Sequence, residues 1–153
     1  YSGTVAGAME GAVLGFPAIA LSQGLERDTL PATMFAVAQA HGAAVVWNIL
    51  EAGMARGGLV SVNFPACAAD AVEGVAVTRQ GRRPQEFVSV DERRDGRNKP
   101  YYWVKYGPRR AEAEEGTDLW ALAHRLISVT PLSVDLTDHG RLDSLGAALA
   151  SEK

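Results

Sequence analysis

The sequence predicts an α/β fold in which helices cover a largely parallel sheet. Residues 18–23 form a short apolar run and residues 59–65 alternate in polarity, and both patterns are typical of strands. Between them, residues 32 to about 54 carry apolar side chains at helical spacing. A strand, a helix and a second strand in this order favour a parallel pair with a right-handed crossover.

A further helix is expected before these elements, over residues 4–15. Gly7, Gly11 and Gly15 recur every fourth position and therefore share one face of this helix. Each glycine costs roughly 1 kcal/mol of helix propensity relative to alanine, so the series needs a compensating role. We interpret it as a smooth face that lets the helix approach a sheet or a ligand closely, and we favour packing on a sheet for Gly11 and Gly15. Phe16-Pro17 is expected to end the helix.

The second half of the chain begins with strand-like stretches at residues 72–80, 86–93 and 100–106. Asp95-Gly96 is a strong turn signal between the last two, which predicts a long β-hairpin. Exposed paired strands are marginal alone, and Tyr101, Tyr102 and Trp103 supply an aromatic surface typical of an interface. We therefore expect the chain to oligomerise.

The remaining residues predict a helix, a strand and a closing helix. Thr117 is expected to cap a short helix over residues 116–124, and the strand over residues 127–136 is expected to be interrupted at Pro131. Residues 139–150 form an amphipathic pattern of helical period.

Composition and charge exclude several kinds of partner. The 153 residues carry a formal net charge of −3, so we expect neither nucleic-acid binding nor binding to an anionic membrane. Cys67 is alone, which excludes an intrachain disulfide and fits a reducing compartment. No apolar run reaches the ~20 residues of a membrane span. We expect a cytoplasmic protein.

The start of the chain is unusual for a complete α/β domain. It begins with Tyr1 rather than methionine, and its first expected helix has no preceding strand on which to pack. We interpret the sequence as the C-terminal portion of a longer protein.

Ser2-Gly3-Thr4 is the main candidate binding site. Two hydroxyls and a glycine lie at the expected N-terminus of the first helix, where unpaired backbone N–H groups and the helix dipole favour an anion. A hydroxyl at this position is more often a plain helix cap. From the residues alone, both a cap and a phosphate site remain open.

Other motifs have a simpler structural explanation. The arginines of residues 78–83 suit phosphate, but a solvated rim or an intersubunit ion pair is the commoner role. Residues 116–118 are expected to start a helix, and His41 to be a packed or surface histidine. Asn63 is expected to be a strand-end residue that bonds its own turn. The sequence contains no GxSxG elbow, no HExxH motif and no paired-histidine spacing.

Several longer stretches follow one another in a distinctive order: YSGTVAGAMEGAVLGFPAIALS, VSVNFP, VTRQGRR, RRDGRNKPYYW, EEGTDLWAL and ISVTPLSVDLT. This succession resembles the SurE family, the stationary-phase survival proteins that act as metal-dependent 5'- and 3'-nucleotidases. The resemblance extends over nearly the whole chain.

The resemblance implies a partial Rossmann-like core of SurE type over residues 1–78, an extended β-hairpin over residues 79–115, and a helix-strand-helix segment over residues 116–153. The hairpin and the C-terminal segment would build a homodimer or homotetramer. The implied reaction is hydrolysis of a nucleoside monophosphate to nucleoside and phosphate, with some activity on 3'-nucleotides or short polyphosphate. The implied cofactor is a divalent cation, commonly Mg²⁺ or Mn²⁺.

By matching of motifs, only Ser2, Gly3 and Thr4 carry over from the family's site, as a wall that contacts the phosphate. The family's metal ligands are an Asp-Asp pair in an NDDG motif, a serine, and an asparagine in a GxNxG loop, and these motifs do not occur here. We therefore assign no catalytic residue and no metal ligand within this chain. The alternative function is a non-catalytic fragment that oligomerises and binds anions.

Overall fold

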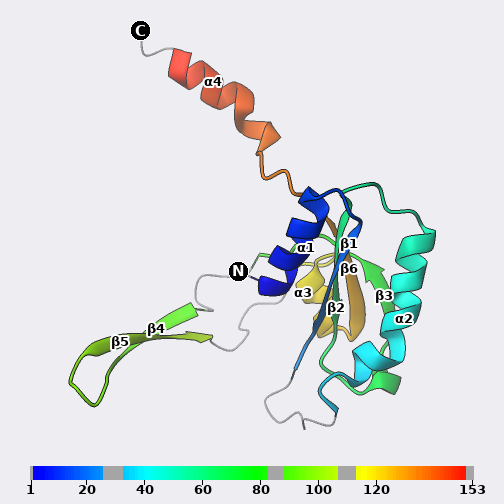
Figure 1. The fold of residues 1–153 in the computed structure, drawn as a ribbon, viewed down its shortest axis with the longest axis horizontal. Coiled ribbons are helices and arrows are strands. Elements are labelled where there is room, and N and C mark those ends of the chain that lie inside the picture. Colours follow the sequence, from blue (N-terminus) through cyan, green and yellow to red (C-terminus); the bar gives the residue numbers. More distant parts are fainter. Residues whose placement is uncertain (1, 26–32, 83–87, 107–112, 151–153) are drawn as a thin grey trace.

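The computed structural model describes residues 2–25, 33–82, 88–106 and 113–150. Its core is a four-stranded sheet with the order β1-β2-β6-β3 (Figure 1). The helices and strands are α1 (Gly3–Val13), β1 (Ala18–Gln23), α2 (Ala36–Glu51), β2 (Leu59–Phe64), η2 (Ala69–Ala71), β3 (Gly74–Val77), β4 (Val88–Arg94), β5 (Pro100–Tyr106), α3 (Asp118–Ala123), β6 (Leu126–Leu132), η4 (His139–Arg141) and α4 (Leu142–Ala150).

The sheet confirms the predicted α/β class and the predicted parallel pair. β1 and β2 are parallel neighbours, and α2 connects them along the chain. β6 lies antiparallel to β2 and parallel to β3, so the sheet is mixed. Helices α1 and α3 cover one side of the sheet and α2 covers the other (Figure 1).

The side of the sheet toward α2 is apolar. Val62, Phe64 and Ile127 are almost fully buried there, against Val37 and Val45 of α2. Alternation along each strand therefore directs the neighbouring residues to the other side. This arrangement makes the α2 side the main hydrophobic core.

The side toward α1 and α3, which we call the hydroxyl face, is apolar at one end and polar elsewhere. Ala18 and Leu59 pack against α1. Farther along, the buried hydroxyls of Thr78, Ser128 and Thr130 bond one another, with Thr78 Oγ1 at 2.8 Å from Ser128 Oγ and 2.7 Å from Thr130 Oγ1. These bonds offset the cost of burying polar groups beside a helix.

Of the three glycines expected to form the smooth face of α1, Gly11 alone packs closely on the sheet. A Cβ on Gly11 would lie 3.6 Å from the Cβ of Ala18, which confirms close packing on the sheet at that position. A Cβ on Gly7 would meet nothing within 4 Å. Gly15 lies beyond the end of α1, where its φ of +87° suits a turn, so the predicted helix end was too late.

Two other boundaries differ from prediction. α2 covers residues 36–51 and is shorter than expected; residue 32 lies outside the described residues. Pro131 does not interrupt its strand, because β6 continues to Leu132 with Pro131 opposite Val60. β3 pairs only with residues 126–129 of β6, so no neighbour on that side needs an N–H at position 131.

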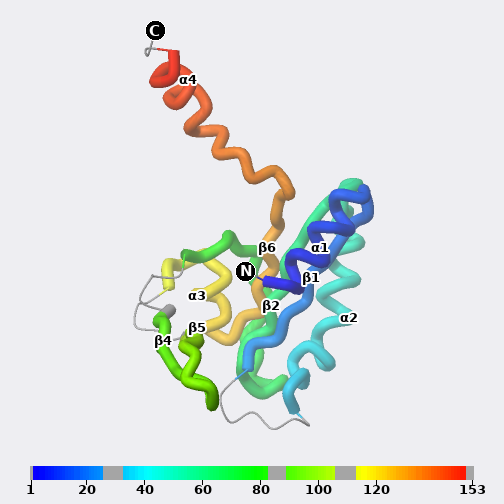
Figure 2. The backbone as a smooth tube through the Cα atoms, turned by 60° about the vertical axis from the view of Figure 1, so that its left-hand side comes forward, coloured from blue at the N-terminus to red at the C-terminus, as the bar shows by residue number. Residues whose placement is uncertain are grey.

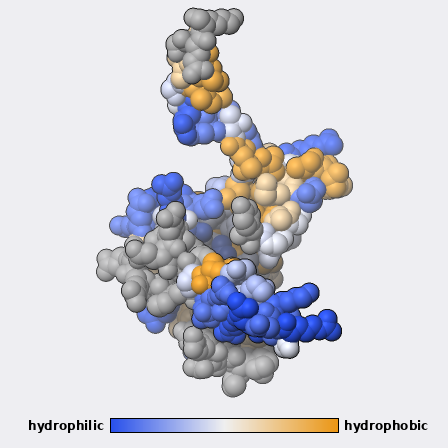
Figure 3. All heavy atoms as spheres, turned by 90° about the vertical axis from the view of Figure 1, so that its left-hand side faces the viewer, coloured by the Kyte–Doolittle hydropathy of each residue, from blue (hydrophilic) through white to orange (hydrophobic). Residues whose placement is uncertain are grey.

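The hairpin and α4 both project from the core. β4 and β5 pair from Val88–Tyr106 to Arg94–Pro100, as predicted, and form a sheet of their own. A second view shows α4 extending away from the sheet (Figure 2). The hairpin presents mostly hydrophilic residues, whereas hydrophobic surface gathers on α4 and at the end of the core from which α4 leaves (Figure 3). Within the described residues, the helices are too short or too polar to cross a membrane.

The segment between β6 and α4 is held by Asp135, whose pKa is lowered from 3.8 to about 2 by hydrogen bonds from the Thr137 hydroxyl, the Thr137 N–H and His139. Because the pKa is depressed, this stabilisation is present above pH 4 and should be lost as the pH falls from 3.8 toward 2. An NMR titration of the Asp135 carboxyl should therefore give a midpoint of about 2. Thr137→Val should raise that midpoint, and a wild-type midpoint of 3.8 would contradict these bonds.

Candidate functional site

The candidate phosphate site is the N-terminus of α1. Ser2 is the N-cap in an extended conformation, and its Oγ accepts a hydrogen bond from Val5 N at 3.2 Å. Its carbonyl oxygen accepts from Ala6 N at 2.9 Å. The next N–H groups, those of Gly3 and Thr4, have no acceptor among the residues that the structure describes. Two backbone donors therefore remain for a ligand.

The surroundings of this helix end suit an anion. Ser2, Gly3 and Thr4 are exposed, and a Cβ on Gly3 would meet nothing within 4 Å. The first turn contains no acidic side chain, so no carboxylate of the helix itself compensates the positive end of the dipole. A phosphoryl group can approach this end directly.

The position of the site in the fold follows from the antiparallel packing of α1 along β1 (Figure 1). Gly11 lies against Ala18. Eight residues back along the helix cover about 12 Å, and four residues forward along the strand cover about 13 Å, so Gly3 lies level with Ser22. Ser22 is near the carboxyl end of β1, and the carboxyl ends of parallel strands are where α/β sheets bind ligands.

A metal centre needs several ligand side chains close together. Among the described residues, no group of three or more His, Cys, Asp and Glu side chains is arranged to hold a metal ion.

One arginine of the motif over residues 78–83, Arg79, is engaged in contacts within the chain. Arg79 forms an ion pair with Glu114 and donates to the carbonyl oxygen of Glu115 at 3.0 Å. These contacts favour the interpretation of Arg79 as a solvated residue at the rim of the fold over its interpretation as a free phosphate-binding arginine. Arg83 lies outside the described residues.

The start of α3 contacts the loop that contains Gly81. Thr117 caps this helix as predicted, and its Oγ1 accepts a hydrogen bond from Trp120 N at 3.2 Å. Asp118 Oδ1 accepts from Gly81 N at 2.7 Å, and a Cβ on Gly81 would lie 2.8 Å from that oxygen and 3.0 Å from Leu119 Cγ.

Gly81→Ala should therefore lower the free energy of unfolding by about 1–3 kcal/mol, measured by denaturant titration. Gly96→Ala is the control, since its Cβ would meet nothing within 4 Å; an equal effect of both variants would contradict the close contact.

The other singled-out residues have structural partners. His41 is packed as predicted, with Nε2 at 2.9 Å from the carbonyl oxygen of Ala69. Asn63 is the last residue but one of β2, near the strand end as predicted, but its Nδ2 donates to Ser61 Oγ at 3.4 Å, so the predicted bond to its own turn was wrong. The reason is that the strand continues through Phe64, one residue beyond it.

Gln23 is a residue whose role the sequence did not reveal. Its Nε2 donates to the carbonyl oxygens of Gly24 and Pro65, both at 2.9 Å, and its Oε1 accepts from Ala38 N at 3.1 Å. It therefore joins the ends of β1 and β2 to the first turn of α2, which has no side-chain cap at Phe35. Two features of the sequence could have indicated this role of Gln23. The residue directly before α2 is not a capping residue, and a polar residue ends the largely apolar strand β1.

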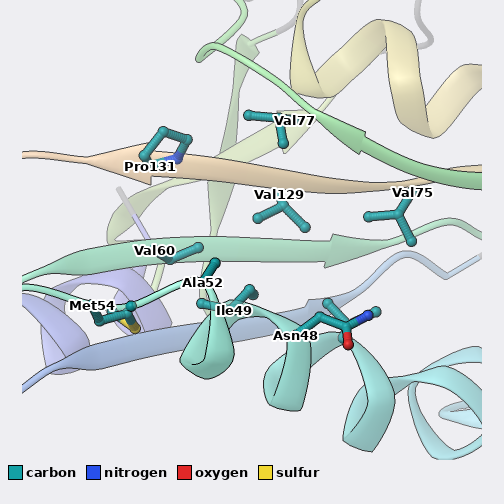
Figure 4. A pocket seen from close by; sticks show the side chains of 11 residues that line it. Asn48, Ile49, Ala52, Met54, Val60, Val75, Val77, Val129 and Pro131 are labelled. Atoms are coloured by element: carbon teal, nitrogen blue, oxygen red, sulfur yellow. The ribbon is translucent and has the colours of Figure 1, made fainter.

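A groove of about 380 Å³ lies on the opposite side of the sheet, between α2 and the strands (Figure 4). Its lining side chains are mostly aliphatic, among them Ile49, Val60, Val77 and Val129, and Asn48 is the polar one. With no cationic group in its lining, the groove does not suit a phosphate.

A comparison with protein-family models shows to which family the chain belongs. The family model described as "Survival protein SurE" matches residues 1–86, more than half of the chain. The chain belongs to the SurE family. This confirms the resemblance seen in the sequence.

Relatives and a solved structure agree with this membership. The chain is 50% identical over 153 residues to "5'-nucleotidase SurE" of Rhodopseudomonas palustris (strain BisA53), covering 98% of the chain and 60% of the relative. It is 53% identical over 149 residues to the protein of the same name from Methylocella silvestris, covering 97% and 59%. The crystal structure of a SurE protein from Aquifex aeolicus matches with a TM-score of 0.76 at 36% identity, covering 97% of this chain and 58% of that one. This SurE chain thus spans about 60% of the length of the curated relatives it matches.

Proposed function

We propose that this chain carries the phosphate-binding part of a metal-dependent 5'-nucleotidase, which hydrolyses a nucleoside monophosphate to nucleoside and phosphate. The observation that carries the proposal is the open end of α1, where Ser2, Gly3 and Thr4 are exposed and the N–H groups of Gly3 and Thr4 have no acceptor among the described residues. Membership of a family whose relatives are named 5'-nucleotidases supports it.

The chemistry of phosphate-ester hydrolysis explains why these donors are useful. A water oxygen bonds to phosphorus, the ester P–O bond breaks, and the nucleoside oxygen leaves and takes up a proton. Negative charge is held throughout by the non-bridging oxygens, which preorganised N–H groups stabilise. Ser2 can both cap and bind, since Oγ accepts from Val5 N while its own O–H stays able to donate.

The proposed cofactor is a divalent cation, Mg²⁺ or Mn²⁺, held mainly by residues outside this chain. The support for this location is that the NDDG and GxNxG motifs, which carry the metal ligands in the resemblance, do not occur in this sequence. This chain alone is therefore expected to be inactive. Because helix N–H groups contact phosphoryl oxygens rather than the sugar, 3'-nucleotides and short polyphosphate are proposed as further substrates.

The proposed assembly is a homodimer or homotetramer in the cytoplasm, without nucleic acid or membrane as partner. Exposed apolar side chains support contacts through the hairpin and α4, with Trp103 55%, Leu145 53% and Leu149 66% exposed. α3 and β6 pack within the core, so the part of residues 116–153 available for such contacts follows Leu132. The division at residues 78 and 115 remains a prediction.

The function is tested by assaying the full-length protein with a nucleoside monophosphate and Mn²⁺. Phosphate release should appear with the cation and stop when a chelator is added. Absence of metal-dependent release would reject the nucleotidase. Phosphate binding without any hydrolysis would favour the second candidate, an anion-binding assembly fragment, for which the open end of α1 is the supporting observation.

A further inference from the structure

Two polar side chains lie side by side at the carboxyl ends of β1 and β2. Ser22 and Asn63 are partners in the parallel register, so their side chains point to the same side of the sheet. Ala18 and Leu59, which are register partners four residues earlier, pack against α1. Ser22 and Asn63 therefore belong to the hydroxyl face, on the side of α1.

These two side chains differ from the other polar groups of that face. Thr78, Ser128 and Thr130 are buried and satisfy one another at 2.7–2.8 Å. Ser22 and Asn63 are only partly buried. Within the described part of the chain, Ser22 makes no side-chain hydrogen bond and Asn63 makes a single long one, from Nδ2 to Ser61 Oγ at 3.4 Å.

Most of the hydrogen-bonding capacity of the Asn63 side chain is unused within the described residues. An asparagine amide offers two N–H donors and a carbonyl acceptor, and the Oδ1 of Asn63 has no donor among the described residues. The side chains of Asn63 and Ser22 are both only partly buried, so water can occupy this unused capacity when no ligand is present. The pair is therefore open to a ligand that replaces that water.

The chemistry of the pair complements that of α1. The backbone N–H groups of Gly3 and Thr4, level with Ser22, are donors, which match phosphoryl oxygens. Asn63, one strand away at about 4.8 Å, offers both a donor and an acceptor. That combination matches a hydroxyl, which both donates and accepts. A ligand held by its phosphate at α1 would place the group attached to that phosphate over this pair.

We propose that Asn63, assisted by Ser22, binds a sugar hydroxyl of the nucleotide while the end of α1 holds the phosphate. This inference rests on the proposed function and adds a specificity-determining residue to it. It predicts that Asn63 separates nucleotides from phosphate esters that carry no sugar.

The test compares two substrates in the full-length protein, a nucleoside monophosphate and p-nitrophenyl phosphate, which has no sugar. Asn63→Ala should raise KM for the nucleotide about 10-fold and leave KM for p-nitrophenyl phosphate and inhibition by inorganic phosphate unchanged. Calorimetry should show a similar loss of affinity for the free nucleoside. Asn48→Ala, an exposed asparagine of α2 on the other side of the sheet, is the matched control and should change none of these values.

The comparison of two substrates also guards against a folding defect, which would lower both activities together. Asn63→Ser, which keeps a smaller polar group, provides a second variant for the same measurements. Equal changes for both substrates, or no change for either, would overturn the role of Asn63 while the nucleotidase stands. A wild-type protein without metal-dependent phosphate release would instead reject the proposed function, and the inference with it.

Discussion

Thr4→Ala in the full-length protein is expected to lower kcat/KM for a nucleoside monophosphate about 100-fold, which corresponds to about 3 kcal/mol of lost transition-state stabilisation. Thr4 is exposed in the first turn of α1 and is not its cap, so its hydroxyl contributes little to folding. The melting temperature should therefore stay within error of the wild-type value. Steady-state kinetics and thermal unfolding of the same preparation give both quantities.

Ser2 and Thr117 provide the control, because both cap a helix with a 3.2 Å hydrogen bond. Ser2→Ala should lower turnover and cost about 1 kcal/mol of stability, whereas Thr117→Ala should cost stability and leave turnover of the surviving folded enzyme unchanged. A Ser2→Ala variant with normal turnover and a lowered melting temperature would show that Ser2 is a plain cap.

Gln23→Leu is expected to lower the free energy of unfolding by about 3 kcal/mol, since each of three hydrogen bonds contributes about 1 kcal/mol. The change leaves the carbonyl oxygens of Gly24 and Pro65 and the N–H of Ala38 without their partner. Denaturant unfolding followed by circular dichroism measures the loss. The apolar replacement has a similar volume, so the loss reports on the bonds rather than on a cavity.

Gln39→Leu is the matched control, because Gln39 is an exposed glutamine of the same helix that receives the Gln23 bond. Its effect should stay within about 0.5 kcal/mol. Equal stabilities of the two variants would mean that Gln23 does not join the strand ends to α2.

Much of the fold follows from local patterns in the sequence. The apolar run at residues 18–23 and the alternation at residues 59–65 identify strands whose burial is set by the sheet itself, and Thr117 is a cap whose bond is local. The pairing of β6 between β2 and β3 could not be predicted, because strand order depends on contacts between residues far apart in the chain. The same reason hides the place of Pro131, which is tolerated only because β3 ends before it.

The site was only partly accessible to the same reasoning. Ser2-Gly3-Thr4 could be named because a helix start and its donors are encoded within a few residues. The roles of Gln23 and of the Ser22–Asn63 pair depend on which strands are neighbours and in what register, and no local pattern carries that information. The local pattern therefore predicts that Asn63 bonds its own turn, whereas the strand continues one residue beyond it and the side chain lies beside Ser22 of β1.

The central claim, that the end of α1 binds phosphate, is tested most directly by NMR of the full-length protein with ¹⁵N-labelled glycine and threonine, titrated with inorganic phosphate. The amide signals of Gly3 and Thr4 should shift and saturate with one common Kd, while Thr117, at the start of α3, should not respond. Signals of Gly3 and Thr4 that stay in place, or that shift no more than Thr117, would contradict the account.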